Sequence, residues 1–234
     1  MSHFANNPFQ RAEFTGTVRL FPVPNLVLFP NVMQPVCITE PRDLDLLADA
    51  LKTDRLLATA MLAPGWELCY DARPEIRPVA CLARIVLSQP LEKDAHNILL
   101  AGVRRVHILA ELPSTKTYRE ARAMICEDIY PPNQSARREE LRQKLRDGLA
   151  EFLPQLPQTC DQLEPLLNSK VSLRVLTDVL GYALEMSPSD RETLLAEVNV
   201  HRRAELLLDH LAELRSNPPT SHPYATFPPH FSTN

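Results

Sequence analysis

The chain has 234 residues, of which 44% are hydrophobic, enough for one large domain or two small ones with a real core. Its formal net charge of -4 implies no general attraction to nucleic acid or to an anionic membrane surface. The 5 glycines stand far from one another among 22 prolines, which excludes the glycine-rich loops that wrap phosphate groups.

The beginning of the chain carries no structural pattern. Residues 1–15 are polar and unpatterned, so we expect a loose tail. They lack the basic and apolar regions of a secretory signal, and no apolar run approaches the length of a membrane span.

The cysteines are scattered and never spaced as C-x-x-C, which favours reduced thiols in a cytoplasmic protein. They are Cys37, Cys69, Cys81, Cys126 and Cys160.

The stretch over residues 20–42, LFPVPNLVLFPNVMQPVCITEPR, organises the rest of the chain. Its prolines fix φ, donate no backbone hydrogen bond and favour extended chain in the residues before them. Between the prolines, residues 26–29 form a short apolar run that predicts a buried strand. Pro30-Asn31 then predicts a turn, because asparagine tolerates positive φ.

A short helix and several extended runs follow this stretch. Leucines at helical spacing predict a helix over 42–52, with Pro41 in its first turn. Gly102 is expected to break one extended run, and residues 119–128 alternate as a half-buried strand does. The predicted strands begin at Thr17 and continue over 55–62, 78–89, 97–101, 103–109 and 119–128.

The composition shifts at Pro131-Pro132, and the signal beyond is helical. Ser187 predicts a helix start, since a capping serine precedes a proline and an acid, and Asn199 predicts the cap of the last helix. The expected helices begin at Ser135, at Val171, after Ser187 and after Asn199. We therefore expect four parts: a tail over 1–15, a β domain over 16–130, a helical domain over 131–215, and a proline-rich, disordered tail over 216–234.

Several motifs together resemble the Lon N-terminal domain, also called the Lon substrate-binding domain. In the opening stretch they are Leu20-Phe21-Pro22, Pro24-Asn25, Leu28-Phe29-Pro30 and Glu40-Pro41-Arg42. Further along they are Val79-Ala80-Cys81, Gly102-Val103-Arg104-Arg105, Tyr118-Arg119-Glu120-Ala121, Leu176-Thr177-Asp178 and Asn199-Val200-His201-Arg202-Arg203. The resemblance is closest to the stand-alone bacterial form and to the related region of cereblon, and it spans about residues 16–215.

The resemblance implies an α+β protein, with an N-terminal PUA-like β pseudo-barrel and a short helix, followed by a C-terminal α-helical bundle. Asn31 stands where the family usually has glycine, and asparagine is the next-best residue for a left-handed turn. Thr39 and Asp43 replace the usual aromatic residues around Glu-Pro-Arg, and these departures weaken any inference that an aromatic pair serves binding there.

No residue constellation predicts catalysis. The chain contains no P-loop, no G-x-S-x-G elbow and no histidine or cysteine spacing typical of zinc, so we expect no cofactor and no metal. The resemblance therefore implies a non-enzymatic module that binds unfolded or extended polypeptide or acts as an adaptor. A protease or an ATPase is the partner class that it suggests.

A strand-rich domain with exposed edges can accept an extended peptide as an added strand, anchored by apolar side chains near the edge. Four residues are candidate anchors, although core packing is the alternative role for each: Phe29, Met33, Trp66 and Tyr118.

The second hypothesis is an RNA-binding PUA-like module. Arg104, Arg105 and Arg122 could line a basic face for it. The negative net charge and the scarcity of aromatic residues beside these arginines argue against nucleic acid as a partner.

Overall fold

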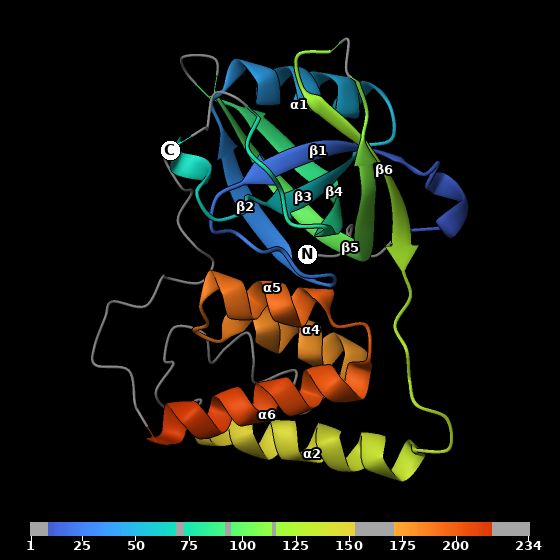
Figure 1. The fold of residues 1–234 in the computed structure, drawn as a ribbon, viewed down its shortest axis with the longest axis vertical. Helices are drawn as coiled ribbons and strands as arrows, with labels where there is room; N and C mark the ends of the chain where they lie inside the picture. The colour runs from blue at the N-terminus through green and yellow to red at the C-terminus, as the bar shows by residue number, and fades with distance from the viewer. Residues whose placement is uncertain (1–8, 69–72, 92–94, 114–115, 153–170, 217–234) are drawn as a thin grey trace. The chain divides into compact units, whose positions relative to one another are not determined.

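The computed structural model describes residues 9–68, 73–91, 95–113, 116–152 and 171–216 (Figure 1). Contacts divide the chain into two compact units between Cys126 and Glu127. We call the described residues up to 126 the barrel unit and those from 127 the helical unit. Within the described part, no helix combines the length and the apolar character that a membrane span requires. The domain limits at 16–130 and 131–215 stay a prediction.

The barrel unit contains one mixed sheet and one α-helix, α1 (Pro41–Lys52), which lies across one end of the barrel in Figure 1. Two 3-10 turns, η1 (Arg11–Glu13) and η2 (Trp66–Leu68), complete its described elements. The strands are β1 (Thr17–Val23), β2 (Met33–Ile38), β3 (Leu56–Met61), β4 (Val79–Pro90), β5 (His96–Glu111) and β6 (Arg119–Cys126).

Five of the strands close into a ring. β1 pairs in parallel with β3 and antiparallel with β6, and the antiparallel pairs β3–β4, β4–β5 and β5–β6 complete it. β5 is 16 residues long, and its two halves have different partners, β2 and β6. Alternating side chains fill the interior, including Leu20, Ala58, Leu82, Val106 and Ala121. β2 therefore lies beside the ring, attached to it through β5 alone.

Gly102 does not interrupt β5, contrary to the expectation from the sequence. The ladder with β4 shifts register between Leu82 and Ala83, which accommodates the extra residue Val103. Gly102 donates its N–H to the Val32 carbonyl at 2.8 Å and accepts the Asn31 N–H at 2.9 Å. A Cβ on Gly102 would lie 2.0 Å from the carbonyl oxygen of Phe29. Gly102 thus allows the backbone around Phe29 to approach β5 closely, and it does not end the strand.

The predicted strand over residues 26–29 is wrong. Val27, Leu28 and Phe29 are buried, as the apolar run indicates, and Leu26 is half-buried. The run forms irregular chain between turns at Asn25 and Asn31, both with positive φ. The strand lies later, at β2, for which the sequence predicted extended chain but no particular strand. A proline is tolerated in β2 because its missing N–H falls on the side away from β5.

Residues 9–15 are not a loose tail. Phe9 and Phe14 pack against the barrel core, and the Gln10 N–H bonds to Glu13 Oε1 at 3.1 Å. Glu13 forms an ion pair with Arg84 on β4, which helps to lower the pKa of the Glu13 carboxyl after the larger effect of the Gln10 backbone N–H. Alternation rules do not reveal such contacts, because this segment is neither helix nor strand.

The helical unit contains α2 (Ser135–Phe152), α4 (Leu173–Ala183), α5 (Pro188–Ala196) and α6 (Val200–Ser216) (Figure 1). The predicted caps are confirmed: Ser187 Oγ accepts the Asp190 N–H at 3.1 Å, and Asn199 Oδ1 accepts the His201 N–H at 3.0 Å. α2 and α6 lie side by side and run in the same direction, which the ion pairs at their two ends show. These pairs are Arg137–Glu205 at 3.0 Å and Glu151–Arg215 at 2.5 Å.

A buried arginine joins the segment after β6 to the helices. Arg203 on α6 has no exposed side-chain surface, and its Nη1 lies 2.6 Å from Asp128 Oδ1. Its Nη1 also donates to the Glu197 carbonyl at 3.0 Å and its Nε to Thr177 Oγ1 at 3.3 Å. The segment around Asp128, between β6 and α2, therefore belongs to the helical unit.

Candidate polypeptide-binding groove

The edge of β2 that faces away from β5 has no strand beside it among the described residues. In the antiparallel register, Pro35 lies opposite Leu99. Proline has no N–H, so this pair must be one of the pairs that exchange no hydrogen bonds. Because the pattern alternates, the backbone groups of Met33 and Cys37 also point away from β5. This edge therefore presents the carbonyl groups of all three residues and the N–H groups of Met33 and Cys37.

A groove of about 380 Å³ runs along this edge. One wall is β2, and the other is the end of β1 with the loop that follows it. Its lining is mostly apolar and consists of Phe21, Pro22, Val23, Pro24, Leu26, Gln34, Pro35, Val36, Cys37, Ile38, Thr39, Glu40 and Asp43. The groove is thus an apolar channel beside an unpaired strand edge.

One side chain of β2 covers part of the edge. Gln34 is 7% exposed, and its Nε2 donates to the carbonyl of Pro35 at 2.9 Å. Proline and a covered carbonyl both reduce uncontrolled pairing of an edge strand. The backbone N–H and carbonyl groups of Met33 and Cys37 remain at this edge for an incoming chain.

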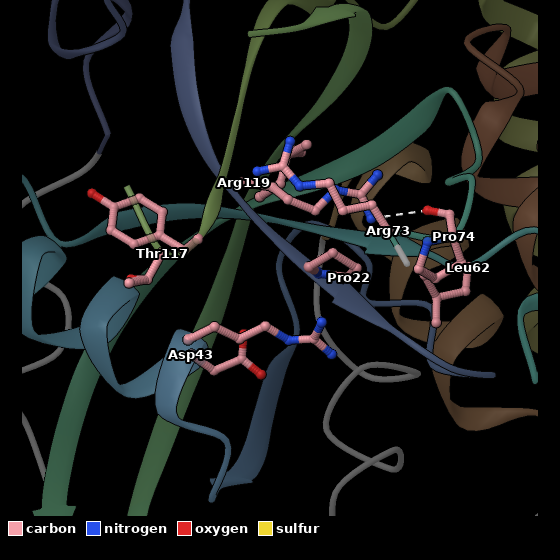
Figure 2. A pocket seen from close by; sticks show the side chains of 10 residues that line it. Pro22, Asp43, Leu62, Arg73, Pro74, Thr117 and Arg119 are labelled. Carbon is pink, nitrogen blue, oxygen red and sulfur yellow. Dashed lines mark hydrogen bonds between the residues drawn. The ribbon is translucent and has the colours of Figure 1, made fainter. Parts of the chain in front are cut away.

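A second, smaller pocket of about 50 Å³ adjoins the groove, because Pro22 and Asp43 line both (Figure 2). Three arginines contribute to its wall: Arg42 on α1, Arg73 before β4, and Arg119 on β6. The remaining lining is Leu20, Leu62, Pro74, Thr117 and Tyr118.

The polar side chains on the β6 side of the small pocket are held by partners. Arg119 binds both oxygens of Glu111 and donates Nη1 to the Pro74 carbonyl at 2.9 Å, the dashed line in Figure 2. The Tyr118 hydroxyl donates to Asp49 Oδ2 at 2.6 Å. The Thr117 hydroxyl donates to Asp45 Oδ2 at 2.7 Å. These bonds fix the wall rather than offer it to a ligand.

Asp43 stands where the groove and the small pocket meet. Burial, and secondly the charge of Glu40, raise the pKa of the Asp43 carboxyl to about 6, although Arg42 opposes the shift. The carboxyl therefore changes charge near neutral pH.

The four anchors proposed from the sequence are not brought together. Phe29 is fully buried and Tyr118 is 4% exposed, so neither offers a peptide much surface. Met33 is 45% exposed at the start of β2, and Trp66 is half-buried in η2. Of the four, Tyr118 alone lines one of the two cavities. The binding role of Met33 and Trp66 stays a prediction.

The groove-lining residues, such as Leu26 and Val36, are not among the anchors predicted from the sequence, all of which are larger aromatic or methionine side chains. Pro35 was the signal in the sequence that could have located the groove, because a proline inside a strand indicates an edge strand with its proline position on the unpaired side.

The basic face required by the RNA hypothesis does not form as expected. Arg105 is 2% exposed, while the Arg104 guanidinium lies 5.6 Å from the centre of the Phe9 ring. Arg122 is exposed on β6. Within the described residues, no group of three histidine, cysteine or acidic side chains could hold a metal ion.

Comparisons with known proteins identify the family and the fold. The family model of the ATP-dependent protease La (LON) substrate-binding domain matches residues 17–213, which include both units. The chain belongs to the Lon substrate-binding domain family. The resemblance read from the motifs and the predicted α+β fold class are thereby confirmed.

Relatives at the level of sequence are Lon proteases. Those of Methylocella silvestris and Cytophaga hutchinsonii are 25% and 23% identical over 195 and 198 residues, which are 83% and 85% of this chain. The match covers 24% of each relative, so this Lon-family chain spans about a quarter of their length.

Two solved structures share the fold. The N-terminal domain of the Mycobacterium avium complex Lon protease has a TM-score of 0.66 at 16% identity, over 84% of this chain and 98% of that one. A Lon N-terminal domain protein from Xanthomonas campestris has a TM-score of 0.57 at 21% identity, over 82% of this chain and 97% of that one. These two structures therefore share the fold of a barrel followed by helices.

Proposed function

We propose that this chain recognises unfolded or extended polypeptide by adding it as a strand to the outer edge of β2. The observation that carries the proposal is the apolar groove beside the outward-facing backbone of β2. Membership of the Lon substrate-binding domain family supports a substrate-binding module of this kind.

The chemistry of the groove favours an extended chain as its occupant. An incoming strand can pair its own N–H and carbonyl groups with those of Cys37, which a folded surface without an open edge cannot do. The apolar walls, including Leu26 and Val36, accept alternate side chains with little selectivity. Unfolded polypeptide exposes both kinds of group, so it fits the groove better than a folded partner.

The proposal makes the chain a recognition module without chemistry of its own. Its relatives are named Lon proteases, and a protease or an ATPase would be the partner that receives the bound polypeptide. In that role the chain is an adaptor, and its groove selects substrates by their lack of structure.

The strand edge is tested with Cys37→Pro, compared with Cys37→Ala. Proline at 37 removes the N–H that points away from β5. The hydrogen bonds between β2 and β5 remain, because residue 37, like Pro35, does not donate to β5. Binding of a fluorescent, reduced and carboxymethylated model protein, measured by anisotropy, should weaken about three- to tenfold for Cys37→Pro. Cys37→Ala should bind like the wild type.

The apolar wall is tested with Leu26→Asp against Leu109→Asp. Leu26 lines the groove, whereas Leu109 is 57% exposed on β5 and lines neither cavity. A charge at 26 should reduce binding of the same model protein, while the change at 109 should leave it unaltered. Equal affinities for all four variants, or no binding by the wild type, would overturn the proposal.

A further inference from the structure

Arg73 is the one arginine of the small pocket that has no ion pair or hydrogen bond within the described residues. Its side chain is exposed and lines the pocket, and its backbone φ of 62° lies in the left-handed region, which is costly for a residue with a Cβ. The bond from Arg119 to the carbonyl of the next residue, Pro74, holds this backbone in place. The fold thus places the Arg73 guanidinium at the wall of a cavity, where no other described residue binds it.

The other basic side chains of the pocket are engaged. Arg119 is bound to Glu111 and Pro74, and Arg42 forms an ion pair with Glu40 at 2.7 Å. A guanidinium binds carboxylates through two parallel N–H bonds. The pocket volume of about 50 Å³ suits a group of a few atoms rather than a large side chain.

The pocket also adjoins the groove, since Pro22 and Asp43 belong to both linings. An extended chain in the groove can therefore place a terminal group or a side chain in the pocket. We propose that the small pocket is a carboxylate subsite, in which Arg73 binds an α-carboxylate or an acidic side chain of the polypeptide held along β2. This inference rests on the proposed function and adds a chemical preference to it.

The test uses an apolar peptide in three forms: with a free C-terminal carboxylate, with a C-terminal amide, and amidated with one glutamate moved through successive positions. For the wild type, the carboxylate-bearing form should bind about tenfold tighter than the amide. Arg73→Gln should reduce this ratio to near one without changing the affinity for the amide. Arg122→Gln, which removes an exposed arginine outside both cavities, is the matched control and should keep the ratio.

The pH dependence gives a second readout. The charged and titratable groups around Asp43 are Glu40 and Arg42 at the start of α1, Arg73 before β4, and Tyr118 and Arg119 on the β6 side. An ionised Asp43 repels a carboxylate in the pocket, and its pKa is raised to about 6. Affinity for the carboxylate peptide should therefore rise as the pH falls from 7.5 to 5.5, where the peptide carboxyl is still ionised. Asp43→Asn should flatten this profile, and the amide should show none.

The outcomes separate the two proposals. If the wild type binds the amide and the carboxylate forms equally, and Arg73→Gln changes neither, the subsite is overturned while strand addition stands. If the wild type binds no form, both proposals fail. Preference for the free terminus identifies the α-carboxylate as the ligand, and preference for a glutamate position identifies an acidic side chain. Either preference, lost in Arg73→Gln, supports the subsite.

Discussion

Single residues decide how closely segments of the barrel approach each other. Gly102 is the clearest case, because it lies against the carbonyl of Phe29 and exchanges two hydrogen bonds with the turn at Asn31 and Val32. Glycine is required there for space. At Gly65 glycine is required for backbone conformation, since φ is +88° but nothing lies within 4 Å of the added Cβ.

We predict that Gly102→Ala destabilises the barrel unit by more than about 2 kcal/mol, because a backbone carbonyl cannot move aside as a flexible side chain can. Gly65→Ala should cost about 1 kcal/mol, from its positive φ alone. Urea denaturation followed by the fluorescence of Trp66, the single tryptophan, measures both values. Equal costs at the two positions would contradict the steric interpretation.

Whole elements are held by a few polar contacts as well as by their apolar faces. The Asp49 carboxylate on α1 accepts from the Tyr118 hydroxyl at 2.6 Å and from Arg19 Nε at 2.8 Å, and these bonds lower the pKa of Asp49 to about 2. Tyr118, proposed from the sequence as an anchor, thus connects α1 to the start of β6. In the helical unit, Arg203 connects α6 to Asp128 and Thr177.

Arg203 and its neighbour Arg202 form a matched pair on α6. We predict that Arg203→Ala costs about 3–5 kcal/mol, because it leaves Asp128 and the buried Asp178 without their buried cation. Arg202 is 53% exposed and lies 3.7 Å from Glu205, so Arg202→Ala should change stability by less than about 0.5 kcal/mol. Far-UV circular dichroism in urea measures both changes in stability. Similar losses of stability in the two variants would mean that burial of the Arg203–Asp128 ion pair is unimportant.

At the scale of the whole molecule, the two units have separate sets of packed elements. The contacts of the sheet lie within the barrel unit, and those among α2, α4, α5 and α6 lie within the helical unit. Regions with their own cores open with their own free energies. Trp66 belongs to the barrel unit, while most of the helical signal comes from the other unit.

We predict that unfolding of the full chain followed by Trp66 fluorescence and by circular dichroism at 222 nm gives two different midpoints. Arg203→Ala should lower the midpoint of the dichroism transition and leave the fluorescence midpoint unchanged. Coincident midpoints that shift together would show that the two units unfold as one cooperative structure.

Much of the fold could be predicted from local patterns. The α1 and α5 helices, the caps at Ser187 and Asn199, and the half-buried strand β6 follow from spacing and capping rules that act within a few residues. The opening stretch contains one wrong prediction and one strand that was not predicted. Residues 26–29 have the composition of a strand but pair with no strand among the described residues. β2 contains a proline, which leaves the ladder with β5 intact because it falls on the unpaired side of the strand.

The motifs along the chain were enough to identify the family, and the resemblance to that family implied the α+β class, because both depend on residues that lie close together in the sequence. Three features follow only from the folded arrangement: which edge of β2 stays open, the groove beside that edge, and the small pocket that both Arg73 and Asp43 line. Strand pairing and cavity walls join residues that are far apart in the chain, so local preference carries no information about them.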